Sequence, residues 1–410
     1  MSQQVEKNNK NKYRSPSQRA WKRFKKNTAA VIGLAVIIIA VLIAILGYLI
    51  TPDSTRNAND QILQITNKEP GFSIQLLHRR KNREVVKRNF IGKMISGQEN
   101  PYELIPIIDF TLEDGVIKYN EFRGKELPGL AGEINLADAH FALSTENPDV
   151  RIDGNTIFFN DYDGVAREES ITDLSQITER KLIKTTTFIL GTDRFGRDNL
   201  SRLIIGVRIS LSVGLVAVLI SLIIGIVLGA SAGYFRGRFD DFVIWFINVV
   251  WSIPTILLVI AITLALGRGF WQIFVAVGLT MWVEVARIIR GQILSLREMQ
   301  FIEAAKGLGF SHARIIFIHL LPNVVGPIIV ISAANFASAI IIEAGLSFLG
   351  IGVQPPMPSW GSMLNENYGY ILSTNPFLAI IPGIAIMLLV LSFNLIGNGF
   401  RDAMDVKTNM

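Results

Sequence analysis

Long apolar stretches recur along the chain and predict helices that cross a membrane. A helix needs about 20 predominantly apolar residues to traverse the hydrocarbon core of a bilayer. Six stretches meet this requirement, at residues 29–50, 211–233, 242–266, 270–289, 324–342 and 378–396. A long and mostly polar segment separates the first stretch from the second. The pattern predicts an all-α polytopic membrane protein with six transmembrane helices and an insert after the first.

The Lys and Arg residues of the short loops predict the orientation of these helices, because cations resist translocation. The tail 1–28 is strongly basic and is therefore expected in the cytoplasm. Segments 234–241 and 290–323 and the tail 401–410 then face the same side, and each contains Lys or Arg, whereas 345–376 contains neither. We predict a multi-pass protein of the cell membrane, with both termini cytoplasmic and the insert extracellular. The first stretch is too long for a signal peptide, and we interpret it as a retained anchor.

The insert, residues 51–187, shows the signals of a small β-rich domain. Stretches 102–110 and 116–122 flank Glu113-Asp114-Gly115, and stretches 150–152 and 156–159 flank Asp153-Gly154. Asp-Gly supplies the positive φ of a type I′ turn, so each pair predicts a hairpin. The chain has no cysteine, so the insert must fold without disulfides. The basic run 78–83 is interpreted as solvated surface rather than as a docking site for an anionic partner or lipid.

Charge and composition exclude several classes of function. The net charge of +6 arises largely in the N-terminal tail, where anionic lipid headgroups would attract it, so nucleic acid is not an expected partner. The four histidines are isolated, and neither a metal-ligand pattern nor a Ser/His/Asp set is present. The chain contains no Gly-x-x-x-x-Gly-Lys-Ser/Thr phosphate loop. We therefore expect no cofactor, no catalysis and no phosphate-loop ATP site in this chain.

Three features near the second and third stretches predict local structure. Leu200, Leu203, Ile204 and Val207 form an amphipathic stripe flanked by Arg197, Arg202 and Arg208, which is typical of an interfacial helix; a plain membrane anchor is the alternative. Glycines 225, 229 and 233 share one helical face and predict close helix packing. Pro254 predicts a kink, either as a hinge or as a packing irregularity.

The cytoplasmic segment 297–323 carries the most specific motif. It contains Glu303-Ala304-Ala305-Lys306-Gly307-Leu308-Gly309 and then His319-Leu320-Leu321-Pro322-Asn323. The first run favours a slim helix that the two glycines break, and the apolar residues 315–318 begin a second helix. The segment is predicted to form a helix–turn–helix along the membrane's inner face, with a small-residue surface presented to a partner.

This motif resembles the signature of the permease family of ATP-driven, binding-protein-dependent importers. The matching residues are Glu303, Ala304, Ala305, Gly309, Leu321 and Pro322. His319 departs from the general pattern, but the His-Leu-Leu-Pro-Asn form is similar to the peptide and nickel branch. Segments 191–211 and 345–361 also resemble that branch, and in particular its C-type oligopeptide and dipeptide permease subunits. The resemblance covers 22–50 loosely and 191–401 closely, and it leaves out the insert, which is long for the family.

The resemblance implies the type I importer permease fold and a set of partners. These are a second, similar permease, two cytoplasmic ATPases that bind ATP and Mg²⁺, and an extracellular peptide-binding protein or lipoprotein. Within the permease core, 188–400, the resemblance assigns coupling to the ATPases to the motif residues Glu303, Ala304, Ala305, Gly307, Gly309 and Pro322. The implied function is import of oligopeptides or dipeptides.

Polar side chains inside the apolar stretches are the candidates for the substrate path, because they are costly when they face lipid. They are Asn335, Glu343, Asn394 and Asn398, and hydrogen bonding between helices is the alternative use for each Asn. We further expect Glu284, Arg287 and Arg290 to form an ion pair along one helical face.

Other functions stay open at this point. Import of nickel or a metallophore by a permease of the same branch is the first alternative, and a membrane receptor that reads a ligand with the insert is the second. The insert itself is expected to contact the binding protein or to shield the outer mouth of the pathway.

Overall fold

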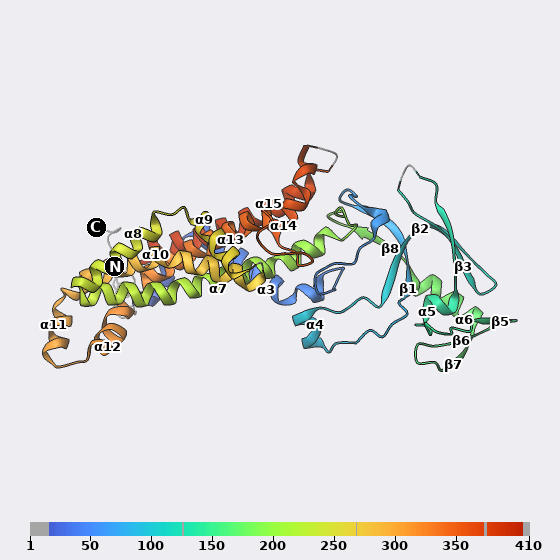
Figure 1. Cartoon of the computed structure of the whole chain (residues 1–410), viewed down its shortest axis with the longest axis horizontal. Helices are drawn as coiled ribbons and strands as arrows, with labels where there is room; N and C mark the ends of the chain where they lie inside the picture. The colour runs from blue at the N-terminus through green and yellow to red at the C-terminus, as the bar shows by residue number, and fades with distance from the viewer. Residues whose placement is uncertain (1–15, 125–126, 268, 373–374, 405–410) are drawn as a thin grey trace, which may run out of the picture. The chain divides into compact units, whose positions relative to one another are not determined.

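The computed structural model describes residues 16–124, 127–267, 269–372 and 375–404 of the chain (Figure 1). The chain divides into two compact units. The first, here called the helical unit, contains the chain up to Ala44, residues 207–365 and the chain from Pro382 onward. The second, here called the mixed unit, contains residues 45–206 and 366–381.

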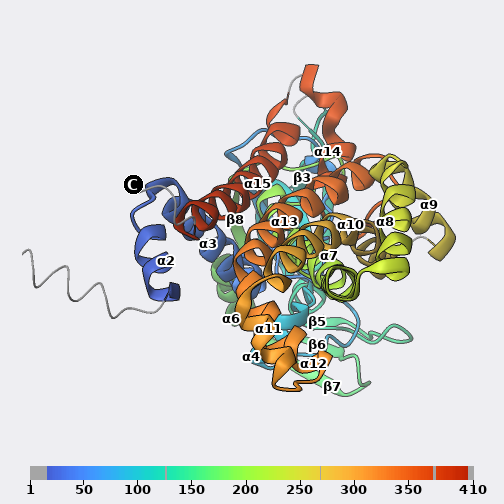
Figure 2. The same ribbon diagram turned by 90° about the vertical axis from the view of Figure 1, so that its left-hand side faces the viewer.

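The secondary structure of the helical unit consists of helices (Figure 2). The helices are α2 (Pro16–Phe24), α3 (Thr28–Ile50), α7 (Asn199–Phe235), α8 (Gly237–Trp251), α9 (Thr255–Leu266), α10 (Phe270–Arg297), α11 (Gln300–Gly307), α12 (His312–Arg314), α13 (Val325–Phe348), α14 (Trp360–Asn367) and α15 (Phe377–Met404). A π-helical turn, Ile315–Leu320, and a 3₁₀ turn, Leu321–Val324, join α12 to α13.

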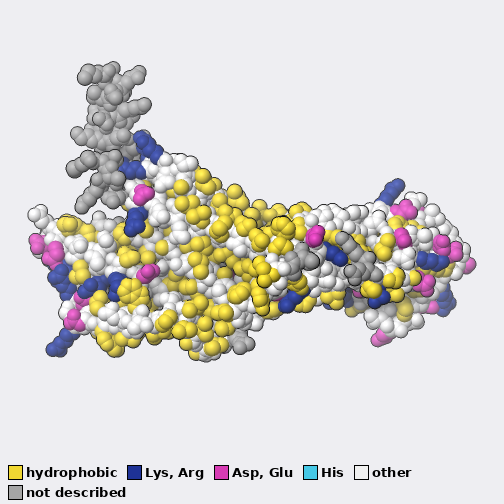
Figure 3. All heavy atoms as spheres, turned by 90° about the horizontal axis from the view of Figure 1, so that it is seen from above, with side chains coloured by type: hydrophobic (Ala, Val, Ile, Leu, Met, Phe, Trp, Pro, Cys, Tyr) yellow, Lys and Arg dark blue, Asp and Glu magenta, His cyan; other side chains and the backbone are white. Residues whose placement is uncertain are grey.

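Length and composition qualify five helical stretches of the described chain to cross a membrane. They are Thr28–Ile50, Asn199–Phe235, Phe270–Arg297, His312–Phe348 and Phe377–Met404. The pair α8 and α9 makes a sixth if it is counted as one broken span. Figure 3 shows hydrophobic side chains over these helices, with Lys and Arg gathered at the end that carries α11 and α12. The multi-span helical architecture is as predicted, and the count is five or six.

The third predicted span, 242–266, is not one kinked helix. Helix α8 ends at Trp251, α9 starts at Thr255, and the two axes differ by 91°. Pro254 lies directly before α9 with φ −54°, where its missing N–H and fixed φ suit the start of a helix. The proline therefore separates two helices instead of bending one.

The second predicted span is longer than 211–233, and no separate interfacial helix precedes it. Helix α7 runs without a break through 37 residues, about 55 Å at 1.5 Å per residue, against a hydrocarbon core of about 30 Å. Its first turns contain the predicted amphipathic stripe, in which Val207 is buried and the other three residues are half-buried. The stripe packs against the protein, so the interfacial interpretation was wrong.

The glycine face of α7 lies against α10, as predicted. A Cβ atom on Gly225 would lie 2.5 Å from Cβ of Val285, and one on Gly229 would lie 2.5 Å from the carbonyl oxygen of Ala286. The missing side chains let the two backbones approach closely. Helix α10 is the most buried of the spanning helices, because it also packs against α8, α9 and α13.

The mixed unit contains two antiparallel sheets. Their strands are β1 (Phe72–Arg80), β2 (Tyr102–Glu113), β3 (Val116–Glu121), β4 (Leu130–Asn135), β5 (Arg151–Asp153), β6 (Thr156–Asn160), β7 (Ala166–Ser170) and β8 (Ile183–Phe188). The first sheet has the order β4-β3-β2-β1-β8 and the second β5-β6-β7. The short helices α4 (Phe90–Ser96), α5 (Leu136–His140) and α6 (Ile171–Ile177) complete the unit. Leu77, Ile107, Ile117, Ile157 and Phe159 lie in its main core.

Both predicted hairpins are present, and their turns differ. In β2–β3, Asp114 and Gly115 have φ of 48° and 75°, as a type I′ turn requires. In β5–β6, Asp153 pairs with Thr156, so the turn residues are Gly154 and Asn155 rather than Asp153 and Gly154. Positive φ falls on Gly154 alone, the first turn position, as in a type II′ turn.

The mixed unit is larger than the predicted insert of 51–187. Strand β8 ends at Phe188, and the unit also includes 189–206 and 366–381. Within it the basic run 78–83 is paired with carboxylates: a guanidinium nitrogen of Arg79 lies 2.8 Å from Asp138, and Arg83 pairs with Glu99. These contacts agree with a structural surface role for the run.

Candidate functional site

Helix α11 places the motif residues on two different faces. Glu303 and Ala304 are exposed, whereas Ala305 is 4% exposed and packs with Ile302 against the π-helical turn. The small-residue surface that the sequence predicts is therefore shared between an outer face and an internal contact. Large apolar side chains stand out beside the outer face: Phe301, Leu308, Phe317 and Ile318 are 44–73% exposed.

A tight turn after α11 reverses the chain. Gly307 is still helical, and it is Gly309 that adopts the left-handed backbone, with φ 76°. The N–H of Gly309 donates to the carbonyl of Lys306 at 2.9 Å, and that of Phe310 donates to the carbonyl of Ala305 at 3.2 Å. The helix is thus broken by Gly309 alone, because only this position needs a residue without Cβ.

The second half of the helix–turn–helix returns beneath α11. Ser311 caps α12, and its hydroxyl accepts from the N–H of Arg314 at 3.3 Å. Pro322 lies at the start of the 3₁₀ turn that leads into α13, a position where its missing N–H is not needed. The buried residues Ile315, Ile316 and Leu320 share one apolar cluster with α11 and α10. This packing holds α11 firmly on the end of α10.

A cavity of about 730 Å³ opens between α10, α13 and α15. Two of the predicted path residues, Asn394 and Asn398, lie on its wall one helical turn apart, together with Gln292 and Arg401. The remaining lining is mostly apolar. The cavity therefore combines a few amides and one cation with an apolar surface, which suits a mixed polar and apolar ligand.

The other two predicted path residues lie inside the helical unit and not on this cavity. Glu343 is fully buried, and its Oε1 accepts from the hydroxyl of Ser347 at 2.7 Å. Asn335 is 1% exposed. Among the described residues, Oε2 of Glu343 and Nδ2 of Asn335 have no hydrogen-bond partner.

The expected ion pair along α10 does not form. Arg290 instead donates to the carboxylate of Asp240 on α8, at 2.7 Å through Nη2. Arg287 donates to the side chain of Asn248 at 3.1 Å and lies over the ring of Trp251 at 3.7 Å. The cations bond to the neighbouring helix, since its polar side chains face α10.

The mixed unit holds a buried ion cluster that the sequence analysis missed. Asp193, Arg197, Arg202 and Glu366 have side chains no more than 7% exposed. Both guanidinium groups reach both carboxylates, at 2.5–2.7 Å. Two cations and two anions balance, which offsets much of the cost of desolvation. The sequence offered no local signal for Glu366, which lies 164 residues from Arg202.

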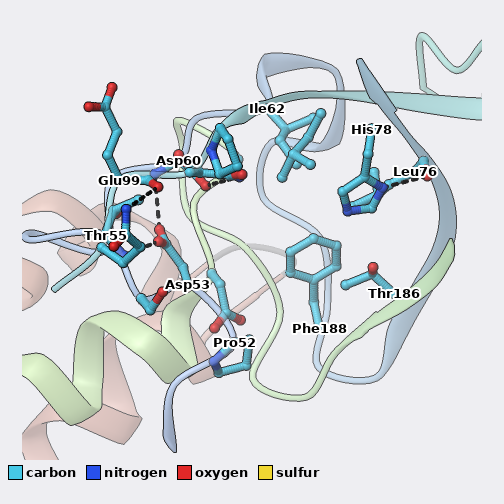
Figure 4. A pocket seen from close by; sticks show the side chains of 17 residues that line it. Pro52, Asp53, Thr55, Asp60, Ile62, Leu76, His78, Glu99, Thr186 and Phe188 are labelled. Atoms are coloured by element: carbon cyan, nitrogen blue, oxygen red, sulfur yellow. Dashed lines mark hydrogen bonds between the residues drawn. The ribbon is translucent and has the colours of Figure 1, made fainter. Parts of the chain in front are cut away.

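A smaller cavity of about 280 Å³ also lies in the mixed unit (Figure 4). Asp53, Asp60 and Glu99 line one side, and Ile62 and Phe188 line the other. Burial, together with the nearby charge of Asp53, raises the pKa of Asp60 to about 6. Among the described residues no group of three or more His, Cys, Asp or Glu side chains could hold a metal ion.

Two family models match the chain. Residues 225–409 match the binding-protein-dependent transport system inner membrane component, and residues 15–70 match the N-terminal transmembrane domain of oligopeptide transport permease C. Neither of these two matches includes the sheets of the mixed unit, residues 72–188.

Curated relatives are similar over about half of the chain. The dipeptide transport system permease protein DppC of Alkalihalophilus pseudofirmus is 46% identical over 53% of this chain and 71% of its own length. The glutathione transport system permease protein GsiD of Pectobacterium atrosepticum is 43% identical over 53% and 72%. The DppC protein of Bacillus subtilis is 41% identical over 56% and 72%. Among solved structures, the inward-facing MetNI methionine transporter matches at 18% identity and a TM-score of 0.43, over 50% of this chain and 97% of that one.

Proposed function

The chain belongs to the family of binding-protein-dependent transport system inner membrane components, and we propose that it is the permease subunit of an ATP-driven importer of oligopeptides or dipeptides. The names of the relatives support the cargo class, because dipeptides and glutathione are both short peptides. The cavity wall of Asn394, Asn398 and Arg401 supports it too, since amides and one cation suit peptide groups and a carboxylate.

The proposal places the chain in a complex. A second, similar permease covers the cavity face of α10, α13 and α15 and forms the other half of the pathway. Both termini lie in the cytoplasm, the mixed unit lies outside the cell, and an extracellular binding protein delivers the peptide. For Asn335 and Glu343, which are buried within the helical unit, the geometry favours a role between helices over one in the path.

The observation that carries the proposal is the surface of α11. Glu303 and Ala304 are exposed next to Phe301 and Leu308, a charged and apolar surface at the cation-rich end of the helical unit. A cytoplasmic ATPase docks there, binds ATP and Mg²⁺ itself, and moves α11 when it closes. The inner face of α11, through Ala305, then passes this movement to α10 and the π-helical turn.

Replacing Glu303 by Lys tests the coupling. In cells that express the whole importer, we expect Glu303→Lys to reduce peptide uptake at least about tenfold, which corresponds to a loss of about 1.4 kcal/mol in the free energy of coupling. The amount of ATPase that copurifies with the permease should fall as well. Glu168→Lys, at an exposed position on β7, is the matched control and should leave both unchanged. Full uptake by Glu303→Lys combined with Ala304→Trp would refute the assignment.

Competition distinguishes the cargo. Uptake of a labelled tripeptide should be reduced by unlabelled di- and tripeptides and not by nickel chelates. If nickel chelates reduced the uptake and peptides did not, the chain would still be a permease subunit, but its cargo would be a nickel chelate.

A further inference from the structure

Helix α4 of the mixed unit carries an exposed apolar face. Phe90, Ile91 and Ile95 are 69%, 60% and 58% exposed, and Val86, just before the helix, is 70% exposed. At 100° per residue, positions 90, 91, 94 and 95 fall within one arc, and Gly92, Lys93 and Ser96 occupy the other. None of the residues of α4 is buried, and Phe90, Ile91 and Ile95 each expose more than half of their surface.

Three cations lie in or directly before α4. Segment 85–98 contains Lys87, Arg88 and Lys93 but neither Asp nor Glu. Arg88 donates to the carbonyls of Ser96 and Gly97, at 2.9 and 3.1 Å, and so places a positive charge at the end of the helix. Apolar residues flanked by cations are the composition of helices that lie on anionic bilayers.

The position of α4 within the mixed unit places it beside the end of the first membrane helix. The N–H of Gln98 donates to the carbonyl of Ser54 at 2.8 Å, and a Cβ atom on Gly97 would lie 2.5 Å from the same oxygen. Ser54 follows Ile50, the last residue of α3, by four residues, a reach of at most about 14 Å.

The short segment between α3 and α4 is also held in place. The hydroxyl of Tyr48 donates to the carbonyl of Arg56, and the N–H of Asp53 donates to the hydroxyl of Ser201 on α7 at 2.9 Å. Helix α3 has 23 residues, about 35 Å, so the bilayer surface lies near its end at Ile50. The contacts of Gly97 and Gln98 therefore keep α4 close to that surface.

We propose that α4 is a membrane-surface anchor of the mixed unit. Its face of Phe90, Ile91 and Ile95 enters the boundary between headgroups and acyl chains, and Lys87 and Lys93 bind anionic phospholipid headgroups. The partner is the bilayer leaflet on the side of the mixed unit, whichever cargo the importer carries.

The absence of cysteine makes this proposal directly testable in the full chain. Ile95→Cys, labelled with an environment-sensitive fluorophore, is reconstituted in nanodiscs of phosphatidylcholine with about one-third phosphatidylglycerol. Ile152→Cys, on β5 and also exposed, is the matched control. Quenching by lipids that carry a nitroxide on the acyl chain should be at least about threefold stronger for position 95 than for position 152.

The charges are tested in the same way. Lys87→Glu with Lys93→Glu should reduce quenching at position 95 in the anionic nanodiscs about twofold or more, with little change in pure phosphatidylcholine. Equal quenching at positions 95 and 152 would overturn the proposal. So would shielding of the label at 95 by an added binding protein instead of by lipid, because that result would assign the face to a protein partner.

Discussion

Replacing Gly229 by alanine should destabilise the helical unit, although a change from glycine to alanine usually stabilises a helix. Alanine is favoured over glycine inside a helix by about 1 kcal/mol. At Gly229, however, the new Cβ would lie 2.5 Å from the carbonyl oxygen and 2.9 Å from the Cα of Ala286. Both are backbone atoms of α10 and cannot rotate away. The first contact falls about 0.9 Å short of the 3.4 Å at which ordinary contacts begin.

The size of the effect follows from these distances. To admit the methyl group, α7 and α10 must separate by nearly 1 Å along a face where Val285 and Ile289 are buried. Overpacking of this kind costs about 1–3 kcal/mol. Subtracting the gain of about 1 kcal/mol in helix propensity from this cost leaves a net loss of about 0–2 kcal/mol in the free energy of unfolding.

Gly291 provides the matched control on α10 itself. It is helical and exposed, and a Cβ atom there would meet no atom within 4 Å. Gly291→Ala should therefore be neutral or stabilise the protein by up to about 1 kcal/mol. The assay is unfolding of the purified full chain in mixed micelles as the denaturing detergent is increased. If Gly229→Ala proved as stable as Gly291→Ala, the close approach of α7 and α10 would be refuted.

Two further predictions concern the mixed unit. The pKa of Asp60 is about 6 in the folded unit and 3.8 for an unperturbed aspartate, so between about pH 4 and pH 6 the folded unit retains a proton that the unfolded chain releases. The contribution of Asp60 to the stability of the unit is therefore highest below pH 4 and decreases as the pH rises to 6. Asp60→Asn should remove most of this dependence of stability on pH and raise the free energy of unfolding at pH 7 by about 1–3 kcal/mol. The measurement is the thermal midpoint of the infrared β-sheet band at pH 4.5 and at pH 7. An unchanged pH dependence would contradict the raised pKa of Asp60. Arg202→Met should lower the free energy of unfolding by about 3–5 kcal/mol in the same measurement, because it leaves buried carboxylates uncompensated. Arg83→Met, which removes an exposed ion pair, should lower it by less than about 1 kcal/mol. Equal effects would mean that the buried cluster is not stabilising.

Local sequence signals predicted the features whose causes are local. The apolar stretches identified the spanning helices because length and hydrophobicity alone decide whether a segment can cross a bilayer. Asp114-Gly115 identified its hairpin because positive φ is needed at two consecutive positions. The spacing of Gly225 and Gly229 identified the packing face of α7, since residues four apart lie on one side of a helix.

Features decided by distant partners were not predictable in this way. Pro254 is compatible with a kinked span and with two separate helices, and the 91° angle between α8 and α9 depends on how each packs against α10. Ala305 looked like a free small-residue surface because the sequence does not show that Ile315 and Ile316 return beneath α11. The expected pairing within α10 failed for the same reason, because Asp240 on α8 offers Arg290 a better-placed carboxylate.

The arginines near the start of α7 and the lysines in and before α4 show most clearly the difference between features with local causes and features decided by distant partners. Arg197 and Arg202 flank an apolar stripe, as Lys87 and Lys93 flank the apolar face of α4, and from the sequence both sets suit an anionic bilayer surface. Arg197 and Arg202 instead form buried ion pairs with Asp193 and Glu366. These ion pairs connect the beginning of α7 to the segment before α15. No carboxylate occurs in segment 85–98, and the apolar face of α4 stays exposed. The availability of a buried counter-ion, and not the local pattern, therefore decides which cations serve the fold and which remain for the lipid.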